Sequence, residues 1–385
     1  MITTILLILF YLAASALLVF LCYRFKWMNK IGAILWAYGI GLVIGSLGLL
    51  PEGSEKVQST LSDILVPLAI PLLLFSMDFK SWTKLAKTTF ISLICAFIAV
   101  IVAIVIGFFI FRNQIPETNK VAGMLVGVYT GGTPNMFALK TALGVDNNLF
   151  ILAQTCDMVV CAVWLLVILS VGQRLLHLIL PPFKKSELKP KAFNLVSEAE
   201  FDSYDGFFRK QNLLQSLAAL GIATVIMAIG VGAMSLVGEK SKMVTVILTI
   251  TTLGLAASLV PWINRIKKSF QLGMYLIVVF SMAIASMADI KIIFSAAGSL
   301  FFFVAIAVFG SLILQVALNR IFKVDADTTI ITSTALIFSP PFVPVVAGAL
   351  KNKEIIISGI TVGLIGYAAG NYLGVTLSYL LEKFL

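Results

Sequence analysis

The stretch Thr130-Gly131-Gly132-Thr133-Pro134-Asn135 interrupts an apolar segment that runs from about residue 121 to 145. Paired glycines and a proline break a helix, and backbone groups freed inside a bilayer must face protein or a water-filled cavity. A second apolar segment, at about 328–350, is broken by Ser339-Pro340-Pro341 and by Pro344. We interpret both segments as re-entrant hairpins, and two kinked spanning helices are the alternative.

The composition around these segments is that of an integral membrane protein. Of the 385 residues, 60% are hydrophobic and 12% are charged, and the mean hydropathy is +1.04. Soluble domains have about 45–50% apolar and about 25% charged residues, so a soluble enzyme, a disordered chain and a fibrous protein are excluded. Ten apolar runs approach the ~20 residues that cross a bilayer. These predicted spans are 2–22, 30–50, 61–78, 88–111, 148–172, 212–236, 243–260, 270–288, 293–318 and 355–381.

The positions of Lys and Arg favour hairpins over kinked spans. The net charge is +10, and cytoplasmic loops of membrane proteins carry an excess of Lys and Arg. With two hairpins, 20 of the 28 basic residues fall on the inside, whereas a spanning first segment would put the most basic loop, 174–210, outside. Because the basic residues are scattered over short loops, they do not indicate nucleic-acid binding. This topology places the N- and C-termini outside.

The first apolar run has one feature of a signal peptide. Ala14-Ser15-Ala16 resembles a cleavage site, but no positive charge precedes the run, and Arg24 and Lys26 follow it. That order of charges predicts a retained helix.

The hairpin topology divides the chain into two inverted halves, 1–176 and 212–385, joined by a mixed-charge cytoplasmic linker at 177–211. Each half has five spans and one hairpin. A short echo supports the repeat: Ser76-Met77-Asp78-Phe79-Lys80 precedes the first break as Ser286-Met287-Ala288-Asp289 precedes the second. Inverted halves with interrupted segments at matching positions are typical of secondary transporters, whose site lies near the bilayer midplane.

Asp157 is the residue that most strongly indicates a function. It lies within an apolar span, where a carboxylate is costly unless it is paired, hydrated or protonated. Gln154 precedes it by three residues and shares its helical face. Asp157 could bind Na⁺ directly or take a proton. A structural hydrogen bond, or pairing with Lys140, is the alternative.

The first break supplies further candidate binding groups. Gly131 and Gly132 let backbone amides face a cavity, and Thr130, Thr133 and Asn135 add side-chain donors and acceptors. A helix that resumes after Pro134 would favour an anion such as a carboxylate at its N-terminus. A packing turn is the alternative.

The second half offers fewer candidates. Ser339 lies at the second break, where freed carbonyl groups could coordinate a cation. Glycines in the last span recur every three or four residues and predict close helix packing rather than ligand contact. Asn371 is a polar exception on that span and a candidate binding residue. The glycines are Gly359, Gly363, Gly366, Gly370 and Gly374.

Motifs for other functions are absent from the sequence. There is no GxxxxGK[ST], HExxH or GxSxG, so neither a P-loop ATPase nor a familiar intramembrane hydrolase is indicated, and we expect no enzyme. The four cysteines lie in apolar runs without a CxxC pair, and the chain has one histidine, so a zinc site and a disulfide framework are not expected. We expect no cofactor other than Na⁺ or H⁺ as a coupling ion.

The sequence resembles the YjcL-like family of uncharacterised bacterial membrane proteins. The resemblance rests on Tyr129-Thr130-Gly131-Gly132-Thr133-Pro134-Asn135, on Asp157, and on the ending from Gly363 to Gly374, and it covers roughly residues 30–380. That family is similar to the sodium/glutamate symporter and to the cation:proton antiporter and anion transporter superfamily. The resemblance implies an inverted-repeat fold with scaffold and transport domains and elevator-like motion. Phe338-Ser339-Pro340-Pro341 departs from the expected Gly-Gly-Pro-Ala-Thr-like second motif.

The sequence therefore predicts an all-α membrane protein of ten spans and two hairpins that acts as a secondary transporter. The expected substrate is a small organic solute, anionic in character, coupled to Na⁺ or H⁺. A cation:proton antiporter without an organic substrate is the alternative. The expected location is the bacterial inner (cell) membrane, with lipid as the surroundings and a homodimer as a possible assembly.

Overall fold

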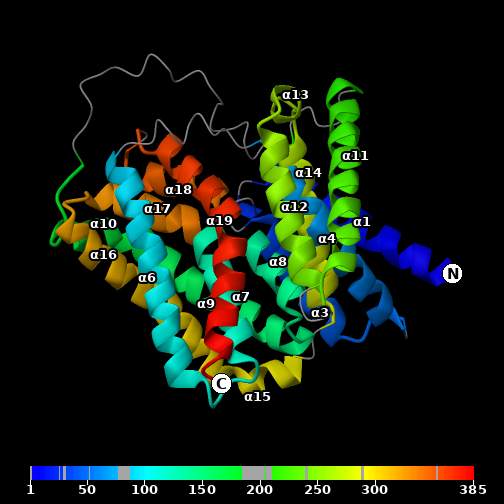
Figure 1. The fold of residues 1–385 in the computed structure, drawn as a ribbon, viewed down its shortest axis with the longest axis horizontal. Helices are drawn as coiled ribbons and strands as arrows, with labels where there is room; N and C mark the ends of the chain where they lie inside the picture. Colours follow the sequence, from blue (N-terminus) through cyan, green and yellow to red (C-terminus); the bar gives the residue numbers. More distant parts are fainter. Residues whose placement is uncertain are drawn as a thin grey trace. The chain divides into compact units, whose positions relative to one another are not determined.

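The computed structural model describes residues 2–25, 27–28, 32–51, 53–76, 87–183, 204, 210–238, 242–287, 290–352 and 354–385. The regular structure of these residues is entirely helical, without a β-strand (Figure 1). Most of the predicted linker, and the greater part of the Ser-Met-Asp echo, lie outside the described residues.

Each of the ten predicted spans coincides with a helix. Among the described residues, seven helical stretches are long and apolar enough to cross a membrane. They are α1 (Ile2–Arg24), α4 (Ser54–Leu74), α6 (Lys87–Phe111), α9 (Asn147–Val167) continued by η1 (Ile168–Gly172) and α10 (Gln173–His177), α11 (Lys210–Ala233) continued by η2 (Met234–Leu236), α15 (Ile290–Ala305) continued by η4 (Ile306–Gly310) and α16 (Ser311–Ile321), and α19 (Ile356–Glu382). The other three are shorter apolar helices, α3 (Ala33–Ser46), α12 (Lys242–Ser258) and α14 (Ser269–Ala285). The chain is therefore a multi-span membrane protein.

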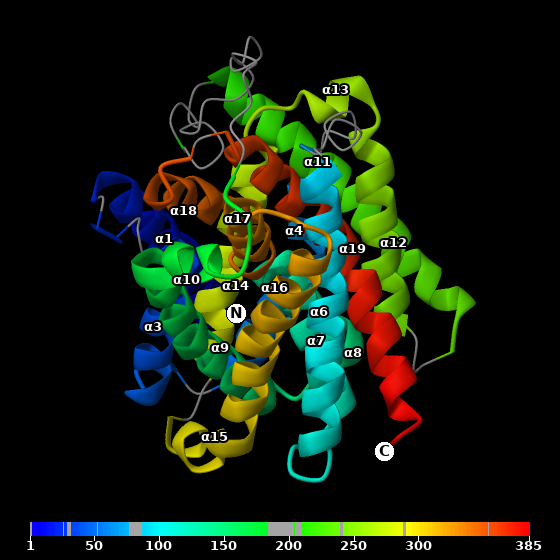
Figure 2. The same ribbon diagram turned by 90° about the vertical axis from the view of Figure 1, so that its left-hand side faces the viewer.

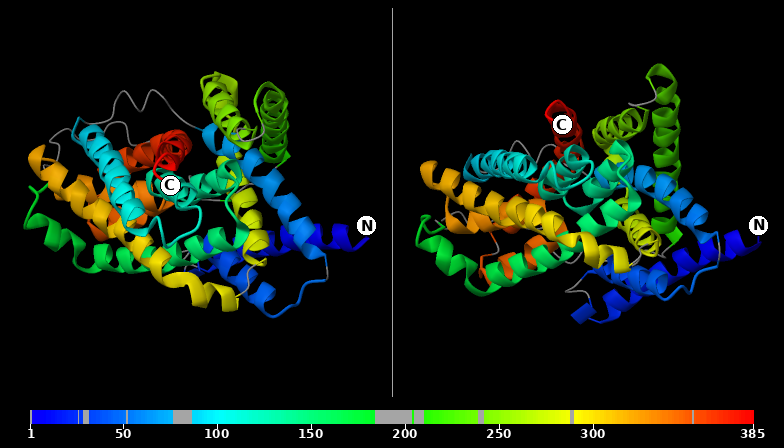
Figure 3. Two further views of the ribbon diagram at one scale, coloured as in Figure 1. Left: turned by 60° about the horizontal axis from the view of Figure 1, so that its bottom comes forward. Right: turned by 90° about the horizontal axis from the view of Figure 1, so that it is seen from below.

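The chain forms two compact units, and each draws residues from both predicted halves. Unit 1 comprises 1–77, 144–152 and 202–297. Its central helix is α14, which packs against α1, α3 and α4, while α11 packs against α12 (Figures 1 and 3). Small residues allow these close approaches, since a Cβ atom at Gly41 would lie 2.5 Å from the carbonyl oxygen of Met282 on α14.

A buried polar cluster joins three helices of unit 1. Gln58 on α4 donates through Nε2 to Tyr11 Oη on α1 (3.0 Å) and to Ser286 Oγ at the end of α14 (2.7 Å). Tyr11 Oη and Ser286 Oγ are themselves 2.7 Å apart. The cluster explains why α4 begins at Ser54 rather than at residue 61 as predicted, because the polar first turns of this helix are anchored by Gln58 instead of facing lipid.

Replacing Gln58 with leucine is expected to lower the stability of the protein by about 1 kcal/mol. The change removes two donated hydrogen bonds, and such bonds within membrane proteins average about 0.6 kcal/mol each. The measurement is the unfolding midpoint in detergent micelles titrated with SDS. The exposed Gln211, replaced in the same way, is the control, and an equal effect of both substitutions would show that the cluster contributes nothing.

Unit 2 comprises 78–143, 153–201 and 298–385. Its long helix α19 packs against α7 (Thr118–Gly131), α8 (Thr133–Leu143) and α17 (Ala326–Ile337), and α6 packs against α16 (Figure 2). The short helices η5 (Pro340–Phe342) and α18 (Val343–Ala349) follow α17. Unit 2 therefore holds both interrupted segments.

Candidate functional site

The first interrupted segment is a helical hairpin. Helix α7 ends at Gly131 and α8 begins at Thr133, and the single residue between them, Gly132, has φ 76° and ψ −176°. A Cβ atom at Gly127 would overlap the side chain of Leu139, twelve residues later. In a continuous helix those residues would be about 18 Å apart along the axis, so α8 must fold back onto α7.

The second interrupted segment folds back in the same way. A Cβ atom at Gly359 of α19 would lie 3.0 Å from Ile331 Cγ1 on α17 and 2.7 Å from Val343 Cγ1 on α18. Two side chains twelve residues apart can both reach one point only if α18 returns alongside α17. At the break, Ser339 has φ 78° and ψ 165°, a conformation that is almost confined to glycine.

The tips of the two hairpins touch each other. A Cβ atom at Gly132 would overlap Ser339 Oγ and would lie 3.1 Å from Ser339 Cβ. Gly132 and Ser339 are therefore in direct contact, and they have nearly the same backbone conformation. Gly132 precedes a proline by two positions and Ser339 by one. The sequence predicted two breaks at matching positions, but the contact between Gly132 and Ser339 could not be seen there.

The glycine face of α19 holds both hairpins. Gly359 and Gly363 receive the second hairpin, since Cβ atoms there would meet Val343 and Pro340. Gly366 lies between the two tips, where a Cβ atom would overlap the carbonyl oxygen of Thr130 and approach Leu336 to 2.9 Å. Asn135 at the start of α8 donates through Nδ2 to the carbonyl oxygen of Gly366 (3.1 Å). The expectation that these glycines pack against helices is confirmed.

Replacing Gly366 with alanine is expected to destabilise unit 2 by about 1–3 kcal/mol, because the added methyl group meets backbone atoms that cannot rotate away. The check is a thermal unfolding midpoint in detergent. Gly298 on α15 provides the matched control, since nothing lies within 4 Å of its Cβ position and alanine should be neutral or slightly stabilising there. Equal midpoints for the two variants would contradict the close approach.

Asp157 is buried on α9 and accepts hydrogen bonds from three side chains. Tyr129 Oη, on α7 near the first tip, donates to Oδ1 at 2.7 Å. Gln154 Nε2 donates to Oδ2 at 3.3 Å and Cys161 Sγ to Oδ1 at 3.2 Å. Helical spacing predicted that Gln154 and Asp157 share a face, and the hydrogen bond between them confirms it. Tyr129 was not predicted, because only tertiary packing brings it to Asp157.

Trp164 continues the same face of α9 toward the second hairpin. It lies seven residues after Asp157, so both side chains project from one side of the helix. Its ring is 5.3 Å from that of Phe338, the residue before the second break, and Phe338 lies 5.2 Å from Phe342. The Trp164 side chain is fully buried, and its Nε1 has no hydrogen-bond partner among the described residues. Trp164 was not among the predicted site residues. Its spacing of seven residues from Asp157, which puts both side chains on one helical face, could have indicated it.

Replacing Trp164 with phenylalanine is expected to leave the unfolding midpoint unchanged or slightly higher. The substitution keeps a ring against Phe338 and removes an N–H group whose burial without a partner costs about 1–3 kcal/mol. Alanine at the same position should lower the stability by about 3–5 kcal/mol through loss of packing. If the phenylalanine variant were as unstable as the alanine variant, the N–H group of Trp164 would have a hydrogen-bond partner in the folded protein.

The remaining predicted binding residues also lie in unit 2, and they differ in burial and in hydrogen bonding. The Thr130 hydroxyl is engaged by its own helix, donating to Val126 O at 2.6 Å. Thr133 is half-buried at the start of α8, Asn371 is buried on α19 beside Gly370, and Lys140 is half-buried on α8. Among the described residues there is no cluster of three His, Cys, Asp or Glu side chains that could hold a metal ion. Tyr129 and Gln154 bring a hydroxyl and an amide group to the Asp157 carboxylate, so their oxygen atoms are candidate ligands for a small cation.

These features define a multi-span helical membrane protein with two helical hairpins in one unit. The chain belongs to the family described as "Protein of unknown function (DUF819)", whose profile matches residues 8–384. It is similar to the "Uncharacterized membrane protein YjcL" of Bacillus subtilis (strain 168), with 24% identity over 376 residues, which is 94% of this chain and 93% of that protein. The family predicted from the motifs is therefore confirmed over the full length.

Proposed function

We propose that the protein is a secondary transporter that moves a small organic anion together with Na⁺ or H⁺. The observation that carries this proposal is the contact of Gly132 with Ser339, two break residues of equal backbone conformation. Tyr129, three residues before Gly132, links the first tip to the buried Asp157 by a hydrogen bond. Hairpin tips that meet next to an intramembrane carboxylate are the arrangement expected of a midplane transport site.

The distribution of helices over the two units supports an inverted repeat. Unit 1 contains the first three spans of each predicted half, and unit 2 contains the fourth span, the hairpin and the fifth span of each, except the first turns of α9 and α15. In this proposal the halves 1–176 and 212–385 are repeats of opposite orientation, giving ten spans with two re-entrant hairpins. Unit 2 is then the transport domain and unit 1 the scaffold, and their relative movement gives elevator-type alternating access.

The two substrates of the proposed cycle have different candidate sites. The coupling ion is assigned to Asp157, with the Tyr129 hydroxyl and the Gln154 carbonyl as further oxygen atoms. The organic anion is assigned to the tips, where the N-terminus of α8 begins directly after Gly132 and favours negative charge. Thr133, Asn135, Ser339 and Asn371 are the polar side chains proposed to contact it.

The same proposal covers location and assembly. The protein is placed in the bacterial inner membrane with both termini outside, in contact with lipid, and with a homodimer as its possible assembly. It acts without chemical catalysis.

The test is solute counterflow in proteoliposomes. Purified protein is reconstituted, preloaded with one of a panel of amino acids and carboxylates, and assayed for uptake of the radiolabelled form with and without Na⁺ and at two pH values. Uptake of one class that rises with Na⁺ or with a proton gradient is expected. Failure to move any member of the panel, together with dequenching of a pH-sensitive dye on adding Na⁺ or K⁺, would instead favour a cation:proton antiporter.

A further inference from the structure

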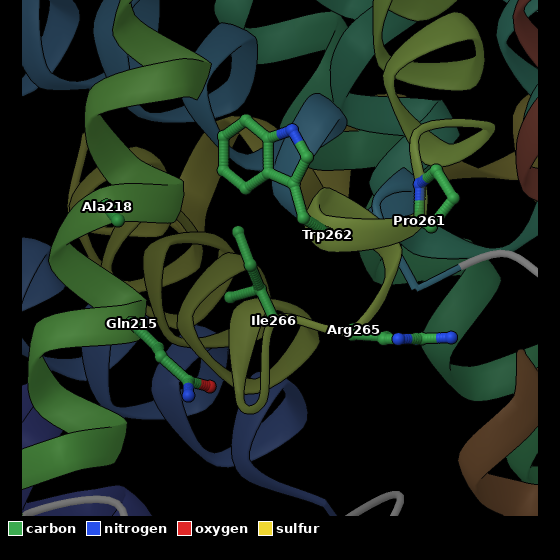
Figure 4. A pocket seen from close by; sticks show the side chains of 6 residues that line it. All are labelled: Gln215, Ala218, Pro261, Trp262, Arg265 and Ile266. Atoms are coloured by element: carbon green, nitrogen blue, oxygen red, sulfur yellow. The ribbon is translucent and has the colours of Figure 1, made fainter.

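A pocket of about 660 Å³ opens in unit 1 between α11 and the short helix α13 (Pro261–Asn264). Figure 4 shows Gln215 and Ala218 of α11 on one side, Pro261 and Arg265 on the other, and Trp262 and Ile266 between them. Its volume lies within the range of about 300–1,000 Å³ that is usual for small-ligand sites. All of its lining residues belong to unit 1, so it is independent of the hairpin tips.

The lining of this pocket is mostly apolar, and α11 carries exposed leucines next in sequence to two of its lining residues. Trp262 is 61% exposed, although it is one of the largest apolar side chains in the chain. Leu214 and Leu217, on α11 beside Gln215 and Ala218, are 58% and 55% exposed. An open, mostly apolar pocket whose bordering helix carries exposed leucines is suited to a ligand with an alkyl chain.

The charged side chains on the described residues of the two helices that border the pocket are all basic. Arg265 lines it, and Lys267 and Lys268 follow within three residues. The sequence contains no Asp or Glu at 206–238 or at 240–288, which covers both helices that border the pocket. The site therefore complements a negatively charged group.

A hydrogen bond fixes the polar edge of the pocket. The backbone N–H of Lys267 donates to Oε1 of Gln215 at 3.0 Å, which ties the basic loop to α11. With its oxygen engaged, the Gln215 amide presents its Nε2 group as a donor to a ligand.

We propose that this pocket binds a phospholipid with an anionic headgroup. The phosphate is held by Arg265, Lys267 and the Nε2 group of Gln215, and an acyl chain follows Trp262, Ile266 and the leucines of α11. A tryptophan beside basic residues at a helix end is the combination found where membrane proteins meet lipid headgroups.

The test uses the full-length protein in nanodiscs with equal amounts of phosphatidylglycerol and phosphatidylcholine. Bromine is placed on the acyl chains of one lipid or of the other, and the contribution of Trp262 is obtained by subtracting the fluorescence of Trp262→Phe. Stronger quenching by brominated phosphatidylglycerol is expected in the wild type. In Arg265→Gln/Lys267→Gln that preference should disappear, since each basic residue near an anionic lipid contributes about fivefold to affinity.

The control is Lys56→Gln/Lys383→Gln, which removes two exposed charges that do not line the pocket and should keep the preference. Equal quenching by the two brominated lipids in the wild type would overturn the proposal. So would relief of quenching by inorganic phosphate, because the site would then recognise the free ion rather than the lipid.

Discussion

The Gly132→Ala variant is expected to lose about 3 kcal/mol of stability, because it combines an unfavourable backbone conformation with a steric overlap. The alanine must adopt φ 76°, which L-residues rarely do, and its Cβ must occupy the position of Ser339 Oγ. The measurement is the free energy of unfolding in mixed detergent and SDS micelles. The same variant should lose transport, because the tips can no longer meet.

A double-mutant cycle separates the strain of the positive φ at residue 132 from the overlap with Ser339. Ser339→Gly relieves the positive φ of the second break and removes the hydroxymethyl group, so its own effect should stay within about 1 kcal/mol. In Gly132→Ala/Ser339→Gly the overlap is absent but the strain at residue 132 remains. The double variant should therefore be about 1–2 kcal/mol more stable than Gly132→Ala alone. Additive effects of the two substitutions would contradict the contact between the tips.

Asp157→Asn is expected to reduce ion-coupled uptake about a hundredfold while leaving the protein folded. Asparagine keeps the size of the side chain and can still accept from Tyr129, but it carries no charge and does not titrate. The free energy of a carboxylate at this depth, about 3 kcal/mol, sets the size of the effect. The readout is the initial rate of counterflow with and without Na⁺ at two pH values.

Glu382→Gln is the control for Asp157→Asn, because it neutralises an exposed carboxylate at the end of α19. Wild-type rates are expected for it. If Asp157→Asn retained uptake with an unchanged response to Na⁺ and pH, Asp157 would have no part in coupling, even if the protein is a carrier.

The helices were largely predictable because the physics that places them is local. Runs of apolar residues near bilayer length predicted ten spans, each of which coincides with a helix, and the glycine and proline at 132–134 predicted where a helix breaks. Helical spacing also paired Gln154 with Asp157. The start of α4 was missed because Glu55, Lys56 and Gln58 lower the hydropathy of a helix whose polar turns are anchored by tertiary contacts.

The candidate site was less predictable because its contacts join residues far apart in the chain. Nothing local in the sequence brings Tyr129 to Asp157, Phe338 to Trp164 or Ser339 to Gly132. Ser339 departs from the expected glycine-bearing motif, yet it adopts the backbone conformation that glycine would favour. Its hydroxyl group occupies space that a side chain at residue 132 would need. Its importance follows from three-dimensional packing rather than from residue type.

The spacing of the glycines on α19 also fixes the handedness with which the hairpins surround it. Four steps from Gly359 to Gly374 take fifteen residues, about 3.75 residues each, which exceeds the 3.6 of one helical turn. A contact line with a longer period than the helix winds around it in the right-handed sense. A hairpin that slid along this line would therefore also rotate about the axis of α19.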